Sequence, residues 1–182
     1  MRNCGDCQLC CKLLPVRELA KPANTRCRHQ KFKVGCAVYR KPMTVVSDGI
    51  PPSCRLWNCR WLVEQAGSVS RPDRCHYVVD LMPDYVTAQE GDGPRTRIEA
   101  VQVWVDPAYP DAHRDPDLRA WLAEQALAGI VAIIRYNARD GFTLVAPALS
   151  GTGEWMEIKS GVEAEHSMEE LFAIEKVKQV AE

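Results

Sequence analysis

Cysteine is the residue type through which this chain can do the most chemistry, and its cysteines are concentrated in one part of the sequence. Eight of the nine fall before residue 60, and Cys75 stands apart from them. Eight thiolates in a small volume repel one another unless a cation holds them. We therefore predict a metal centre, with the ligands Cys4, Cys7, Cys10, Cys11, Cys27, Cys36, Cys54 and Cys59.

The first four of these cysteines form the pattern C-x2-C-x2-C-C. A third cysteine at this spacing is similar to the ferredoxin-type run that wraps one iron–sulfur cluster. A simple zinc ribbon instead needs two separated C-x2-C knuckles. The side chains of the adjacent Cys10 and Cys11 diverge, which indicates two nearby sites or one polynuclear site. Eight thiolates fit two Cys4 zinc ions or two Cys4 clusters, with a slight preference for iron–sulfur clusters.

The pattern resembles that of the bacterial CxxCxxCC cysteine-cluster family, whose shared domain is described as zinc- or iron-chelating. The likeness covers residues 3–63 and includes Gly35-Cys36-Ala37-Val38-Tyr39 and Pro52-x-Cys54-x4-Cys59-x-Trp61-Leu62. It implies metal binding at the same eight cysteines. One departure is the stretch of eleven residues between Pro42 and Cys54, because the family has an Arg-Pro just before that cysteine.

The other side chains that can bind metals are given different roles. His29 stands two residues after Cys27, but eight cysteines already complete the ligand set, which favours a place beside the site. Cys75, at the expected start of a strand, is predicted to be a buried thiol. His113 and His166 stand in polar segments and are expected to be solvated.

Charge is distributed unevenly along the chain. Residues 1–62 carry twelve Lys/Arg and three Asp/Glu, a net of +9, whereas residues 63–182 carry a net of −10. We interpret the cations as neutralising thiolate charge. A zinc-finger-like nucleic-acid binder is the less favoured hypothesis. A further alternative is an iron–sulfur redox or protein-modifying enzyme whose acidic part binds an unknown protein partner or substrate. No catalytic signature follows residue 63.

The compartment follows from two sequence features. No apolar run reaches the roughly 20 residues that span a bilayer, and the first residues contain no apolar core of an export signal. We therefore expect a cytoplasmic protein with no membrane span. A reducing cytosol also argues against reading the cysteines as a disulfide framework.

The elements that position these residues predict two units and an α+β fold. Residues 1–66 have little periodicity, which indicates a cysteine-rich, metal-stabilised module with little regular structure and a short helix capped by Ser53. Residues 72–182 are expected to form a small, mainly antiparallel sheet with two helices. One helix begins at Pro116 behind an Asp115 N-cap, and a capping box opens the other over 167–180. The strands are expected at 75–81, 97–105, 130–136, 142–146 and 154–158.

Overall fold

The computed structural model describes residues 2, 4–38, 50–89 and 92–159. Its main feature is a five-stranded sheet with the order β3-β4-β5-β6-β7. The strands are β3 (Tyr77–Ala88), β4 (Thr96–Val105), β5 (Val131–Arg135), β6 (Gly141–Val145) and β7 (Met156–Ile158). Neighbouring strands pair antiparallel except β4 and β5, which are parallel. The expected combination of helices with a mainly antiparallel sheet is confirmed, while the helix expected at 167–180 lies outside the described residues.

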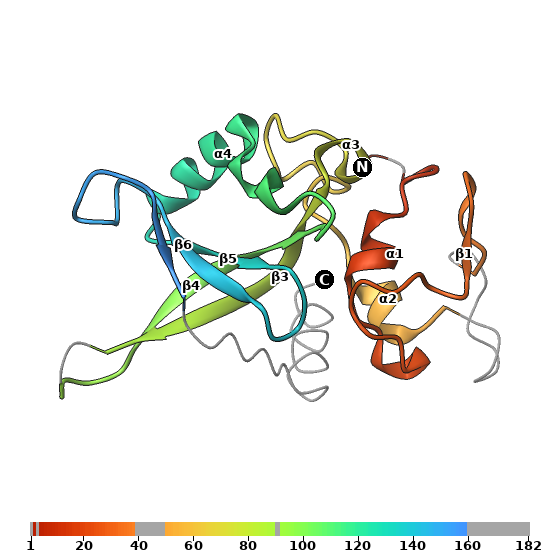
Figure 1. Ribbon diagram of the computed structural model, residues 1–182, viewed down its shortest axis with the longest axis horizontal. Helices are drawn as coiled ribbons and strands as arrows, with labels where there is room; N and C mark the ends of the chain where they lie inside the picture. Colours follow the sequence, from red (N-terminus) through yellow and green to blue (C-terminus); the bar gives the residue numbers. More distant parts are fainter. Residues whose placement is uncertain (1, 3, 39–49, 90–91, 160–182) are drawn as a thin grey trace, which may run out of the picture.

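Helix α4 (Pro116–Ala126) covers one face of this sheet (Figure 1). The Asp115 carboxylate accepts the N–H of Asp117 at 2.9 Å, which confirms the predicted N-cap. The apolar stripe of α4 is buried, and its members are Leu118, Trp121, Leu122 and Ala126. The chain passes from β4 to β5 through the 3₁₀ helix η2 (Pro110–Arg114) and α4, and this long crossover permits their parallel pairing.

The edge strand β3 contains the irregularity that receives the cysteines. Its register with β4 shifts after Val79, so residues 80–82 are left out of the ladder. The segment around Cys59 uses this free edge, with an antiparallel bridge between Cys59 and Asp80. Arg60 donates its backbone N–H to the Val79 carbonyl at 2.9 Å. Cys59 is thereby held against the sheet by backbone contacts.

We call residues 4–38 and 50–63 the cysteine-rich region, and it lies beside one end of the sheet in Figure 1. Its elements are α1 (Leu9–Leu13), η1 (Arg17–Leu19), the antiparallel pair β1 (Gln30–Lys31) and β2 (Gly35–Cys36), and α2 (Pro52–Leu56). Such short helices are not stable by themselves, so packing or ligands must hold them. The short helix α3 (Pro72–Cys75) then leads into β3. None of the described helices has the length and apolar character to cross a membrane.

The cysteine-rich region packs on the sheet through a shared apolar core. Leu13 from α1 and Leu62 meet Val78 of β3 and Trp104 of β4, and all four are buried. A salt bridge adds to this contact, with the Lys12 ammonium 2.6 Å from the Asp106 carboxylate. The two parts of the described chain are therefore joined by continuous packing.

Three local predictions are wrong. Ser53 does not cap α2, because it lies inside the helix and donates its hydroxyl to Glu18 at 2.8 Å. Cys75 ends α3 and does not begin a strand, although its predicted burial is confirmed at 8% exposure. His113 is 3% exposed and not solvated, because η2 turns it against the Phe142 ring. His166 lies outside the described residues.

Candidate metal centre

All eight cysteines predicted as ligands line one cavity of about 920 Å³. They reach it from three separate stretches of chain: the loop and helix α1, the turn and hairpin of β1 and β2, and α2 with the segment that follows it. Most of the remaining wall is apolar, with Leu14, Val38 and Ile50 among its members. The cavity is partly open to the surroundings and is not an enclosed void, and seven of its eight cysteines are only partly buried.

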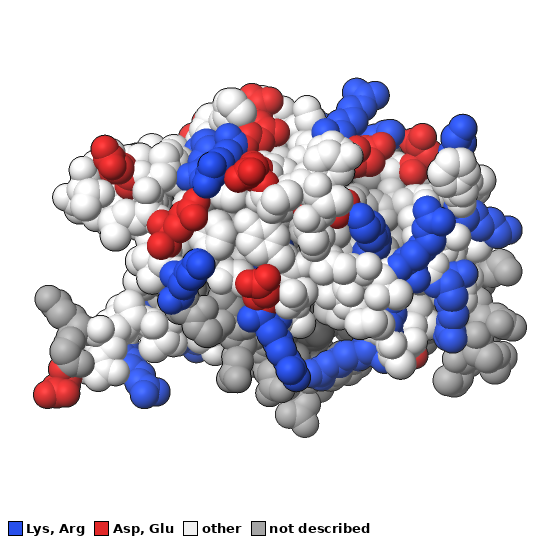
Figure 2. All heavy atoms as spheres, in the orientation of Figure 1, with Lys and Arg blue, Asp and Glu red and all other residues white. Residues whose placement is uncertain are grey.

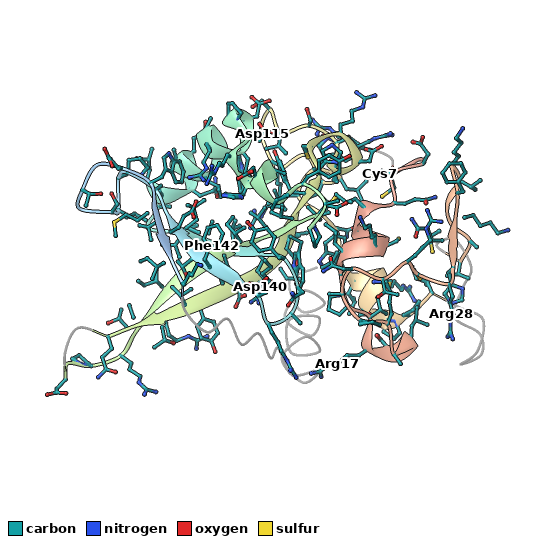
Figure 3. All side chains as sticks on the ribbon, in the orientation of Figure 1. Cys7, Arg17, Arg28, Asp115, Asp140 and Phe142 are labelled. Carbon is teal, nitrogen blue, oxygen red and sulfur yellow. The ribbon has the colours of Figure 1, made fainter. Side chains whose placement is uncertain are left out.

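Backbone N–H groups point at two of the sulfurs. Cys7, on the loop before α1 and towards α3 (Figure 3), accepts N–H bonds from Leu9 and Asp73. Cys59 accepts them from Trp61 and Leu62. Hydrogen bonds of this kind stabilise a thiolate and tune the metal that it binds. The local turns after Cys7 and Cys59 therefore suit metal ligation.

Burial keeps most of these thiols protonated when no metal is bound. It raises the pKa of Cys4 to about 11, with added repulsion from Cys59 and Cys7. It raises the pKa of Cys54 to about 12, with added repulsion from Cys11 and Cys27. Both values lie well above the ordinary value of 9.0. A metal ion must therefore displace protons to bind, which couples its affinity to pH.

The adjacent Cys10 and Cys11 titrate as a pair. A hydrogen bond between the two side chains raises the pKa of Cys10 well above its usual range and lowers the pKa of Cys11. The Lys21 ammonium also lowers the pKa of Cys11 by electrostatic attraction. Cys11 is therefore the member of the pair that loses its proton first.

Lys21 is a site residue that the sequence prediction missed. Its side chain is 8% exposed, and its ammonium donates to the backbone carbonyls of Lys12, Leu14 and Pro22. Burial lowers its pKa, whereas four neighbouring cysteines, Cys27, Cys11, Cys54 and Cys10, raise it. Lys21 thus satisfies backbone carbonyls at the end of α1 and places one positive charge near the thiols. A lone lysine between two short turns carries no sequence signal for this role.

The cysteines share the cavity without converging on one point. Among the described residues, no three His, Cys, Asp or Glu side chains come together as a ligand set for one metal ion. His29 lines the cavity beside Cys27, and its ring nitrogen Nε2 lies 3.3 Å from Nε of Arg28. Cys75 lies elsewhere, where its thiol faces the carbonyls of Ser70 and Tyr77.

Raising the pH is expected to destabilise the metal-free protein between pH 9 and about 12. The folded-state pKa values of Cys4 and Cys54 exceed the ordinary value of 9.0, so the folded chain binds these protons more tightly than the unfolded chain. Their contribution is complete below pH 9 and is lost as the pH rises through about 11 to 12. Urea unfolding midpoints measured across this range give the decrease of stability with pH, and this decrease should be smaller in Cys54→Ser. An equally large decrease in wild type and in the serine variant would contradict this.

Exposed cations cover the outside of the cysteine-rich region. Figure 2 shows Lys and Arg side chains gathered over this part of the surface, and Figure 3 places Arg28 beside β1. Six exposed cations make no ion pair within the part of the chain that the structure describes: Arg17, Arg26, Arg28, Lys31, Lys33 and Arg55. They supply positive charge around a cavity that thiolates would make strongly negative.

Comparisons of the chain with protein-family models, with curated proteins and with solved structures found no match.

Proposed function

We propose that this protein is a metal-binding cysteine-cluster protein that holds iron–sulfur clusters or zinc through its eight cysteines. One observation carries the proposal: all eight cysteines before residue 60 line the same cavity, although their positions span 56 residues of sequence. Thiols brought together from distant segments in this way form a donor set for soft metals. Cys4, Cys7, Cys10, Cys11, Cys27, Cys36, Cys54 and Cys59 would supply the ligands.

The surroundings of the sulfurs support ligation over simple burial of thiols. The N–H groups directed at Cys7 and the buried ammonium of Lys21 both stabilise negative sulfur. Neutral thiols in an apolar core would be stabilised little by these N–H groups or by this ammonium. Cys75 provides the contrast within the same chain, because its thiol lies apart from the other eight and faces backbone carbonyls.

We favour iron–sulfur clusters over zinc for this donor set. A tetrahedral zinc site places each sulfur about 2.3 Å from the metal, which puts the sulfurs themselves about 3.8 Å apart. The cysteines here are spread around a cavity of about 920 Å³. The inorganic core of a cluster is larger than a single ion and separates its cysteine ligands more widely. The C-x2-C-x2-C run points the same way.

Anaerobic purification followed by elemental analysis tests the proposal. We expect a coloured protein that contains iron and acid-labile sulfide, and we expect Cys75→Ser to contain the same amounts. A colourless protein with two zinc ions would support metal binding but show that the metal is zinc and not an iron–sulfur cluster. A protein without iron, zinc or sulfide after reconstitution would refute the function.

A further inference from the structure

The contacts of the eight cysteines divide them into two groups. In the first group, Cys59 belongs to the apolar core shared with the sheet, and Cys4 and Cys10 pack against that same core. Cys7 joins them through the turn in which its N–H donates to the Cys4 carbonyl at 2.9 Å. Electrostatic repulsion agrees with this grouping, because among the cysteines Cys59 and Cys7 raise the pKa of Cys4 the most.

The second group lies around the hairpin and α2. Gln30 donates its N–H to the Cys27 carbonyl at 3.0 Å and pairs with Cys36 across β1 and β2, so the hairpin links the turn that contains Cys27 to the strand that contains Cys36. The electrostatic neighbours of Cys54 among the cysteines are Cys11 and Cys27. The wall of the cavity includes all four members: Cys11, Cys27, Cys36 and Cys54.

Helix geometry explains why the boundary falls between two adjacent residues. Successive side chains on a helix are rotated by about 100°, so Cys10 and Cys11 on α1 face different directions. Their hydrogen bond makes them the point where the groups touch. Cys54 and Cys59 are separated in a similar way, because Cys54 lies on α2 whereas Cys59 is bridged to Asp80 of β3.

We infer that the cavity holds two separate metal centres, one bound by Cys4, Cys7, Cys10 and Cys59 and the other by Cys11, Cys27, Cys36 and Cys54. This inference rests on the proposed function and adds the assignment of ligands to it. The surroundings of the two centres differ. The first adjoins the apolar core around Leu13 and Trp104, and the second adjoins the Lys21 ammonium.

Pairs of serine substitutions test the assignment. The within-group pairs C10S/C59S and C11S/C54S should each retain about half of the wild-type metal, as should each single variant. The cross-group pair C54S/C59S should lose all of it, although its two positions are only five residues apart. Loss of all metal in every single variant would show one shared centre and overturn the inference. Retention of half the metal by C54S/C59S would overturn the grouping.

A second measurement does not depend on the folding of variants. Wild-type protein is treated with increasing chelator, the exposed thiols are alkylated, and mass spectrometry identifies which cysteines react. The members of each group should become reactive together, in two steps, while Cys75 serves as an internal reference that binds no metal. Simultaneous reaction of all eight would overturn the inference. Absence of metal from the wild-type protein would refute the proposed function itself. Metal binding with simultaneous reaction of all eight cysteines would refute only the two-centre assignment.

Discussion

Removal of the metal is expected to open the cysteine-rich region while the five-stranded sheet stays folded. The helices of this region are single turns that cannot persist alone, and they surround a cavity of about 920 Å³. The principal core of the sheet lies beneath α4 and contains Val103 and Ile134, both fully buried, and none of the eight cysteines belongs to it. Its packing therefore does not depend on ligation.

Hydrogen exchange with mass spectrometry measures this difference. Peptides from 4–38 and 50–63 should exchange rapidly in chelated protein, whereas peptides from 97–105 and 131–135 should keep their protection. Protein reloaded with metal is the matched control and should recover protection in both parts. Unchanged protection of the cysteine-rich peptides in metal-free protein would contradict the expectation. It would mean that the shared core around Leu13 and Trp104 holds this region by itself.

Replacing Asp80 by alanine is expected to lower the free energy of unfolding by about 2 to 4 kcal/mol, because two donors lose a buried acceptor. The Asp80 carboxylate is 4% exposed and accepts the indole N–H of Trp57 at 2.7 Å and the backbone N–H of Met82 at 2.8 Å. Its backbone also bridges Cys59. Loss of the Trp57 bond loosens the segment that leads to Cys59, so the alanine variant is also expected to lose metal from the proposed centre that contains Cys59.

Asp80→Asn is the control for this prediction, because the amide keeps an oxygen where the carboxylate accepts both bonds. Chemical denaturation should place the asparagine variant much closer to wild type than the alanine variant. Equal losses of stability in the two variants would show that the charge of Asp80, and not its hydrogen bonds, is what the fold requires.

The regular elements of the sheet unit were predictable because short-range rules specify them. Asp115 before Pro116 is a cap signal, and the stripe that includes Trp121 has helical spacing. The apolar run from residue 130, the turn and the run from 142 became the β5–β6 hairpin. The parallel pairing of β4 with β5 was not predicted, because strand order depends on contacts between distant segments.

The errors have the same physical origin. Ser53 has the side chain of a cap, but Pro52 already occupies the first turn of α2, and Glu18 from another segment takes the Ser53 hydroxyl. His113 stands among polar residues, yet tertiary packing buries it against Phe142. In each case a partner remote in sequence outweighed the local pattern.

By itself the sequence determined the number, type and spacing of the thiols, because a C-x2-C-x2-C-C run and four later cysteines already define a donor set for soft metals. Only the tertiary structure decided which thiols share a neighbourhood. The bulge of β3 receives Cys59, the hairpin links the turn of Cys27 to the strand of Cys36, and the fold brings Lys21 near enough to Cys11 to lower its pKa. Sequence spacing constrains only neighbours along the chain, whereas the distance between remote segments is set by packing, and it is packing that groups the sulfurs.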